Sequence, residues 1–264
     1  MSHDLITQSI DERGVVRVTL CHAARHNALS QAMIAALDRV FADYEADPSC
    51  RLVCLYGAGK SFCAGGDLGW MKTQMEASRK ERIAAATELA ALLRRIDRFP
   101  KPVIGCVTGN AFGGGVGLMA VCDEVLVIAG ARFGLTEARL GLIPATISPY
   151  VVGRIGRGHA RHLVLSAQIF DSEEAVRIGL AHQLVPPDDF AAVVESRVSH
   201  YLAASPQAVA AAKRLIRNLP ETVDDATIAF TVEALADCWD LADAAEGVTA
   251  FFEKRPPRWT SDAE

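Results

Sequence analysis

The sequence predicts an α/β fold with a largely parallel sheet, and two observations support this prediction. Short β-branched or apolar runs, typical of buried strands, recur at 15–20, 52–56, 103–107 and 125–128. Between the first two runs, apolar residues at helical spacing predict a helix over 31–45, with Ser30 as its N-cap. The order strand, helix, strand is the order that a parallel sheet requires.

The second half of the chain has a different pattern. After about residue 140 the strand-like runs end, and we expect a helical region. Helix starts are predicted at Asp171/Ser172 and at Ser205-Pro206, and a further long helix is predicted over 224–241.

Composition and charge exclude several classes of protein. Half of the 264 residues are apolar and 22% are charged, which is the balance of a folded globular protein rather than a disordered one. The net charge of −5, without a long basic run, argues against a nucleic-acid partner. No run of about 18 apolar residues occurs, so no membrane partner is expected. Residues 1–9 lack a secretory pattern and the seven scattered cysteines lack a CxxC pair, so a cytoplasmic location is expected.

Three glycine-containing segments, each following or adjoining a predicted strand, are candidates for chemistry: 61–68, 109–117 and 132–137. Glycines at a strand-to-helix corner let unpaired backbone amides approach an oxyanion closely. By itself, Gly113-Gly114-Gly115 is more often a tight turn or a close-packing site. The sequence lacks both the GxGxxG dinucleotide fingerprint and the GxxxxGK[ST] phosphate loop, and its histidines show no metal-ligand signature, so no metal is expected.

Together these segments resemble the crotonase (enoyl-CoA hydratase/isomerase) superfamily over essentially the whole chain. The matching pieces, in the family's order and spacing, are Arg25-His26-Asn27-Ala28-Leu29, Phe62-Cys63-Ala64-Gly65-Gly66-Asp67-Leu68, Gly113-Gly114-Gly115, Cys122-Asp123, Glu137, Gly141-Leu142-Ile143-Pro144, and Glu246-Gly247 before Phe251. The resemblance implies the α/β ClpP/crotonase-like fold, a spiral of ββα turns with a C-terminal helical trimerisation region. The core with the CoA and active site would span 1–200. The helical region over 201–264 would pack on this core and on a neighbouring subunit of a homo-trimer or hexamer.

The resemblance assigns catalytic roles to Gly66, Gly114 and Glu137. The amides of the two glycines would form an oxyanion hole for the thioester carbonyl, and each such donor stabilises a transition state by on the order of 3 kcal/mol. The dipole of a helix expected to begin near Val116 would strengthen the donor at Gly114. Glu137 would exchange a proton with the carbon next to the carbonyl. Partial desolvation would raise its pKa and suit it to this exchange near neutral pH.

The resemblance also implies a set of positions that bind an acyl-CoA thioester. These positions are Arg25, Asn27, Ala28, Ala64, Gly65, Asp67, Leu68, Trp70, Met71, Thr146, Ser148 and Lys254. The backbones around Ala28 and Ala64 would bind adenine, and Lys254 would reach the CoA phosphates, often across a subunit boundary. A solvated tail explains Lys254 equally well, and core packing explains Trp70 and Met71 equally well. CoA is part of the substrate, so no separate cofactor is expected.

Two departures from the family pattern bear on the reaction. Gly117 stands where ordinary hydratases carry a second glutamate that orients water. The stretch 139–151 replaces their Gly-Gly-Thr-Gln type sequence and resembles methylglutaconyl-CoA and isohexenylglutaconyl-CoA hydratases of leucine and acyclic-terpene breakdown. The resemblance therefore predicts hydration of a branched 2-enoyl-CoA that bears a distal carboxylate. Thr146, Ser148 or that carboxylate would orient the water, and Arg139 or Arg154 would pair with the carboxylate.

Two other functions stay open at this point. A Δ3,Δ2-enoyl-CoA isomerase needs one carboxylate and no activated water, so Gly117 favours it. A noncatalytic acyl-CoA-binding member would have kept the fold and lost the reaction, although Gly66, Gly114 and Glu137 are all present.

Overall fold

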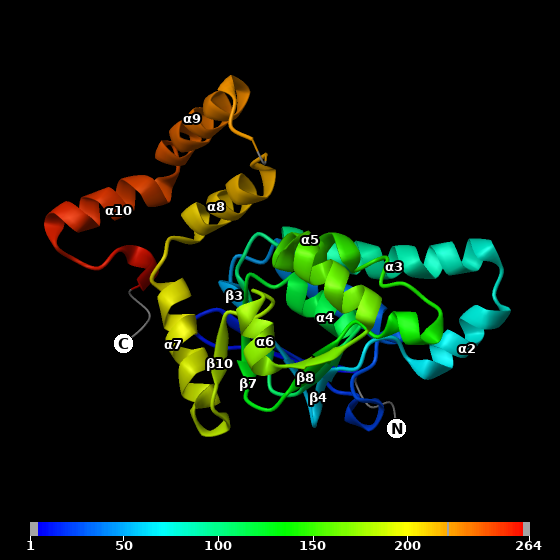
Figure 1. Cartoon of the computed structure of the whole chain (residues 1–264). Helices are drawn as coiled ribbons and strands as arrows, with labels where there is room; N and C mark the ends of the chain where they lie inside the picture. The colour runs from blue at the N-terminus through cyan, green and yellow to red at the C-terminus, as the bar shows by residue number, and fades with distance from the viewer. Residues whose placement is uncertain (1–4, 221, 261–264) are drawn as a thin grey trace.

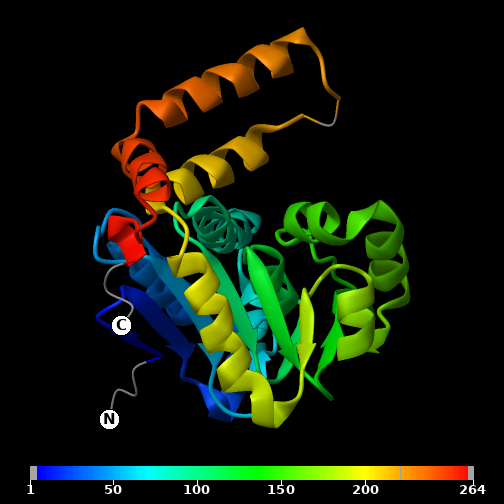
Figure 2. The same cartoon turned by 90° about the vertical axis from the view of Figure 1, so that its left-hand side faces the viewer.

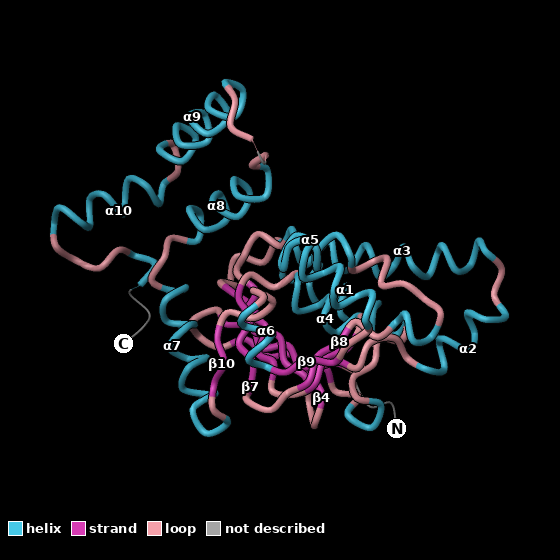
Figure 3. Tube along the Cα trace, viewed as in Figure 1, coloured by secondary structure: helices cyan, strands magenta, loops and turns pink. Residues whose placement is uncertain are grey.

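A computed structural model describes residues 5–220 and 222–260 and arranges them in two sheets with helices around them (Figures 1 and 3). The larger sheet has six strands among these residues. Their order is β1 (Ile6–Ile10), β2 (Val15–Leu20), β3 (Leu52–Gly57), β5 (Val103–Val107), β7 (Glu124–Ile128) and β10 (Gln183–Val185). The pair β1–β2 is antiparallel, and every other neighbouring pair is parallel.

A second sheet stands beside the first. Its order is β4 (Ser61–Cys63), β6 (Asn110–Phe112), β8 (Arg132–Gly134) and β9 (Ile169–Asp171). Three times in succession, the chain adds one strand to the larger sheet and the next strand to the smaller one, as β3/β4, β5/β6 and β7/β8. The chain thus winds as a spiral, and the ends of β4, β6 and β8 lie side by side because these strands are neighbours.

Helices cover both faces of the larger sheet. On one face lie α1 (Gln31–Glu45), α3 (Arg79–Arg98) and α4 (Gly114–Ala120), and α5 (Ser148–Ser166) packs against α4. On the other lies α7 (Phe190–Leu202). Alternate strand residues serve the two faces: Val53 and Leu55 pack with the first group, and Leu52 and Cys54 pack with α7. Both faces are buried, which explains why the central strands are continuous apolar runs.

The remaining elements lie towards the periphery. They are α2 (Leu68–Glu76), α6 (Ser172–Arg177), α8 (Pro206–Asn218), α9 (Asp225–Trp239), α10 (Ala242–Glu253), and the short 3-10 turns η1 (Ala23–Arg25), η2 (Glu137–Leu140), η3 (Pro187–Asp189) and η4 (Arg258–Thr260). No helix within 5–220 and 222–260 is long and apolar enough to cross a membrane.

Most of the predicted element boundaries are confirmed. The helix over 31–45 is α1, and Ser30 caps it by accepting a hydrogen bond from the Met33 amide. The caps at Asp171 and Ser205 and the long helix after Asp224 are also observed. The helix expected near Val116 begins two residues earlier, at Gly114.

The prediction that strands end near residue 140 is wrong, because β9 and β10 follow. Both have only three residues, which is too short for alternation or an apolar run to be recognised. The edge strand β1 was also not predicted, since four of its five residues are exposed.

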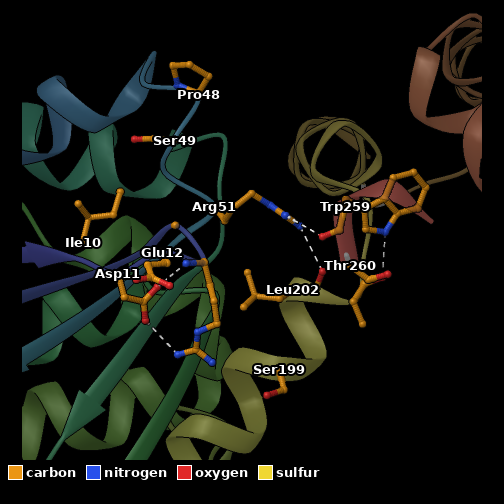
Figure 4. A pocket seen from close by; sticks show the side chains of 13 residues that line it. Ile10, Asp11, Glu12, Pro48, Ser49, Arg51, Ser199, Leu202, Trp259 and Thr260 are labelled. Carbon is orange, nitrogen blue, oxygen red and sulfur yellow. Dashed lines mark hydrogen bonds and ion pairs between the residues drawn. The ribbon is translucent and has the colours of Figure 1, made fainter. Parts of the chain in front are cut away.

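The C-terminal helices project from the core (Figures 1 and 2). Lys213 ties α8 to the core by pairing with Asp123 at 2.7 Å and donating to the Lys101 carbonyl at 3.0 Å. After α10, η4 returns to the core, where Arg51 donates to the carbonyls of Trp259 and Leu202. Arg51 is among the residues that line a cavity of about 1090 Å³ (Figure 4). None of the residues that line this cavity belongs to the glycine-containing segments, and one of its two arginines, Arg51, is engaged in holding the tail.

Candidate active site

The first glycine corner follows β4 and is held by Leu29. Leu29 forms a single parallel bridge with Gly66: its amide donates to the Gly65 carbonyl at 2.7 Å, and its carbonyl accepts from the Asp67 amide at 3.3 Å. In a parallel bridge of this kind, the amide of the middle residue points away from the partner strand. The N–H of Gly66 is therefore directed away from Leu29.

The second corner joins β6 to α4. Gly113 is the N-cap of α4, with φ 47° and ψ −114°, a conformation that residues with a side chain rarely adopt. Its amide donates to the carbonyl of Gly134 at 2.9 Å, which ties the corner to the end of β8. Gly114 is the first residue of α4, so its N–H has no partner within the helix.

The two corners lie against each other. A Cβ atom at Gly65 would lie 3.5 Å from the nitrogen of Gly114, and a Cβ atom at Gly114 would lie 3.8 Å from the Cα of Gly65. Glycine is required for this approach, because a Cβ at Gly65 would also lie 2.9 Å from the carbonyl oxygen of Phe112. The fold thus brings together the two segments that the sequence singled out.

Glu137 stands at the start of η2, three residues after β8 ends. A Cβ atom at Gly113 would lie 2.7 Å from Glu137 Oε1, so the carboxylate is next to the second corner. Glu137 Oε2 is shielded from solvent and has no hydrogen-bond partner among the described residues. Burial raises the pKa of Glu137 above its ordinary value of 4.5, while a hydrogen bond from its own backbone acts in the opposite direction.

Gly117 faces an isoleucine. A Cβ atom at Gly117 would lie 2.9 Å from Ile147 Cβ and closer still to its Cγ2. Ile147 is buried and is the N-cap residue of α5. No side chain can therefore be added at position 117 without displacing Ile147.

The start of α2 borders the first corner. Asp67 caps this helix by accepting from the Trp70 amide at 2.9 Å, and it pairs with Arg25 at 3.3 Å. The hydrogen bond from Trp70, with a contribution from Arg25, lowers the pKa of Asp67. A Cβ atom at Gly66 would lie 2.9 Å from Met71 Cε and 3.7 Å from the Trp70 ring. Trp70 and Met71 therefore lie over Gly66, whereas Leu68 is exposed.

The segment 27–29 runs beside the first corner. Asn27 is fully buried in a left-handed conformation, and its amide group donates to the carbonyls of Ala58 and Ser61 at 2.9 and 2.8 Å. Its side chain is thus committed to the fold. The Ala64 amide donates to the His26 carbonyl at 2.9 Å, which aligns this segment with the one that contains Ala28.

Several predicted residues lie elsewhere or are already engaged. Lys254 ends α10, on the opposite side of the molecule from α2 in Figure 1. Ser148 donates its hydroxyl hydrogen to the Pro144 carbonyl at 2.7 Å, and Thr146 is half-buried. Arg154 donates to the carbonyls of Ala120 and Cys122 at the end of α4, so its guanidinium is engaged in the fold. Arg139 is exposed on η2.

Sequence reasoning missed the roles of Leu29, Gly113 and Ile147. Leu29 orients the amide of Gly66, Gly113 contacts Glu137, and Ile147 covers Gly117. The glycine run was a signal for Gly113, whereas nothing in the sequence pairs positions 117 and 147. The described residues contain no group of three potential metal ligands, and His3 lies outside them.

Comparisons with known proteins show the family of this chain. A family model described as enoyl-CoA hydratase/isomerase matches residues 11–262. A short-chain-enoyl-CoA hydratase of Clostridium acetobutylicum is 32% identical over 246 residues, which cover 92% of this chain and 93% of that protein.

Solved structures give the same result. An enoyl-CoA hydratase from Shewanella pealeana superposes with a TM-score of 0.93 at 36% identity, covering 97% of this chain and 96% of that one. Pseudomonas aeruginosa AtuE superposes with a TM-score of 0.93 at 34% identity, covering 98% and 100%. The predicted crotonase fold is confirmed, and the chain belongs to the enoyl-CoA hydratase/isomerase family.

Proposed function

We propose that the protein adds water to a 2-enoyl-CoA through an enolate, with Glu137 as the acid and base. The observation that carries this proposal is the solvent-shielded, unpartnered Oε2 of Glu137 beside the Gly113-Gly114 corner. A buried carboxylate oxygen without a partner costs stability, and such a cost is common where a group must be free to react.

The amides of Gly66 and Gly114 would receive the thioester oxygen. In the reaction, a water oxygen bonds to carbon 3 and loses a proton to Glu137. The π electron pair between carbons 2 and 3 shifts to form a double bond between carbons 1 and 2, and the carbonyl π pair moves onto the thioester oxygen, which gives the enolate. Glu137 then delivers a proton to carbon 2 and the thioester carbonyl reforms. Fixed donors stabilise the enolate because they need no reorganisation when charge develops.

For the acyl group we propose a branched chain that bears a distal carboxylate. Support comes from Arg139, which is exposed two residues after Glu137 and is not among the ion pairs of the described residues. Trp70 and Met71 over Gly66 would contact the apolar part of the chain. Ser148 still has lone pairs that can accept from a water, although its hydrogen is engaged with Pro144.

For CoA we propose that the backbones of segments 27–29 and 63–65 hold the adenine. Arg25, exposed beside them, would approach the phosphates. Within one chain, α10 lies on the opposite side of the molecule from α2 (Figure 1), so we propose that Lys254 at its end serves the site of a neighbouring subunit.

We propose that α8–α10 assemble the protein into a trimer or hexamer. Large apolar side chains on these helices are exposed, with exposed fractions of 63% for Trp239, 78% for Phe251 and 77% for Phe252. An apolar surface of this extent is typical of an interface.

Double-bond migration from a 3-enoyl-CoA is a second candidate function. The contact between Gly117 and Ile147 favours it, because Glu137 is then the carboxylate at hand for moving one proton between carbons 2 and 4.

The test is mass spectrometry of products from 3-methylglutaconyl-CoA, its isohexenyl homologue, crotonyl-CoA and a 3-enoyl-CoA, with wild type and Glu137→Ala. Gain of one water on a branched glutaconyl thioester, lost in the variant, is expected. Bond migration leaves the mass unchanged, so it is followed by the ultraviolet absorbance of the conjugated 2-enoyl thioester. Its appearance from the 3-enoyl-CoA, with no water gained by any substrate, would reject hydration in favour of isomerisation.

A further inference from the structure

Position 117 lies one turn after Gly113 along α4, and the two glycines face different segments of the chain: Gly113 faces Glu137 and Gly117 faces Ile147. The Gly117 amide donates to the Gly113 carbonyl at 3.1 Å, so the two residues are stacked on one helix face about 6 Å apart along the axis. Helical side chains tilt towards the N-terminus of their helix. A long side chain at 117 would therefore extend towards Gly113, which contacts the Glu137 carboxylate.

Ile147 occupies the space that such a side chain needs. It lies against the missing Cβ of Gly117, is 2% exposed, and belongs to the main hydrophobic core. Its position is fixed by the backbone, because its carbonyl accepts from the amides of Tyr150 and Val151 in the first turn of α5. Ile147 comes six residues after Gly141, the C-cap of η2, and it is the N-cap of α5, which packs against α4.

We propose that Ile147 is a specificity-determining residue that keeps a second carboxylate, and the water it would hold, away from the oxyanion hole. Glu137 is then left with all proton transfers. This inference rests on the proposed function. It attributes the one-carboxylate chemistry of this chain to the Gly117–Ile147 contact as a pair, and not to Gly117 alone.

The experiment compares Gly117→Glu, Ile147→Ala, the double variant Gly117→Glu/Ile147→Ala, and the isosteric control Gly117→Gln/Ile147→Ala. Hydration of crotonyl-CoA is measured for each. We expect kcat/KM of the double variant to exceed that of Ile147→Ala at least tenfold, and that of the Gln control to stay within twofold of it. The proposal is overturned if folded Gly117→Glu alone gains as much as the double variant, or if the double variant matches its Gln control.

A steric cycle covers the case in which the glutamate variants do not fold. Gly117→Ala should lower Tm in wild type and should lower it less in the Ile147→Ala background, because that change removes Cγ2, the closest atom to the new Cβ, and leaves only the 2.9 Å contact with the Cβ of residue 147. Equal Tm losses in both backgrounds overturn the proposal. Deuterium exchange at carbon 2 of butyryl-CoA, dependent on Glu137, distinguishes failure of the proposed role of Ile147 from failure of the proposed function. Its presence in wild type with a failed cycle rejects only the role of Ile147, and its absence rejects the proposed function as well.

Discussion

The carboxylate of Glu137 lies directly against the backbone of Gly113, so a Cβ atom there would lie 2.7 Å from Oε1. Gly113 itself has a φ of 47° and donates its amide to Gly134, at the end of the strand that leads to Glu137. The hydrogen bond from Gly113 to the end of β8 holds the two residues near each other, and the absence of a side chain at Gly113 leaves room for the carboxylate.

Gly113→Ala should reduce activity sharply. The new methyl group would displace the carboxylate, and alanine would be strained at this φ. We expect kcat/KM to fall by about 100-fold, since misplacement by an ångström costs this much. Gly153→Ala, in open space on α5, is the matched control and should retain activity within twofold. Near wild-type kinetics for Gly113→Ala would contradict the proposed position of the carboxylate.

The pH profile should show the raised pKa of Glu137. The carboxylate must be ionised to accept a proton from water, so kcat/KM should rise with pH through a value above 4.5 and then level off. Steady-state kinetics between pH 4 and 9 measure this. A profile that is flat down to pH 4.5 would rule out Glu137 as the titrating base.

Glu137→Gln should stabilise the protein at neutral pH. Because burial raises the pKa of Glu137, the folded state binds the proton more tightly than the unfolded state, and stability is lost as pH rises through the raised pKa. Glutamine removes this loss. The free energy of unfolding measured in urea should therefore be about 1 kcal/mol higher for the variant at pH 7.5 and nearly unchanged at pH 4. The exposed Glu173→Gln is the control. Destabilisation by Glu137→Gln at pH 7.5 would contradict the burial of an unpaired carboxylate.

Asn27→Ala should lower the free energy of unfolding. Its side chain makes three hydrogen bonds, two to the carbonyls of Ala58 and Ser61 and one from the His22 amide. Leaving these buried groups unpaired costs on the order of 3 kcal/mol. Asn218→Ala, which removes one exposed hydrogen bond to Arg214, should change unfolding free energy by less than about 0.5 kcal/mol. A similar small effect for Asn27→Ala would show that its side chain does not hold this segment.

Charges on α9 should disrupt assembly. Leu235 and Trp239 lie one turn apart and are each more than half exposed. The double variant Leu235→Lys/Trp239→Lys should reduce the mass measured by light scattering to that of one chain, because buried unpaired charges oppose association. Leu165→Lys, an exposed leucine on α5, is the control. An unchanged mass for the double variant would place the interface elsewhere.

The elements that the sequence predicted well are those whose signals are local. The central strands are buried on both faces and appear as apolar runs, and Ser30, Ser205 and Asp224 act as caps within three residues. The strands β9 and β10 have three residues each, and tertiary pairing holds them in place. No local signal distinguishes such strands from loops.

The candidate site also combines residues with a local sequence signal and contacts that only the folded chain creates. Gly66, Gly114 and Glu137 were located by motif, and the structure brings their loops together. The contact between Gly117 and Ile147 joins α4 to α5 across 30 positions of sequence, so no periodicity indicates it. The role of Asp67 also needed the structure, because the same residue caps α2 and pairs with Arg25.

The central claim is that Glu137 exchanges a proton at carbon 2 of an enolate held beside it. Wild type and Glu137→Gln should be incubated with butyryl-CoA in heavy water, and deuterium at carbon 2 followed by mass spectrometry. We predict exchange by wild type and exchange at least about 100-fold slower in the variant, in line with the loss of a general base. Equal rates for the two proteins would contradict the account.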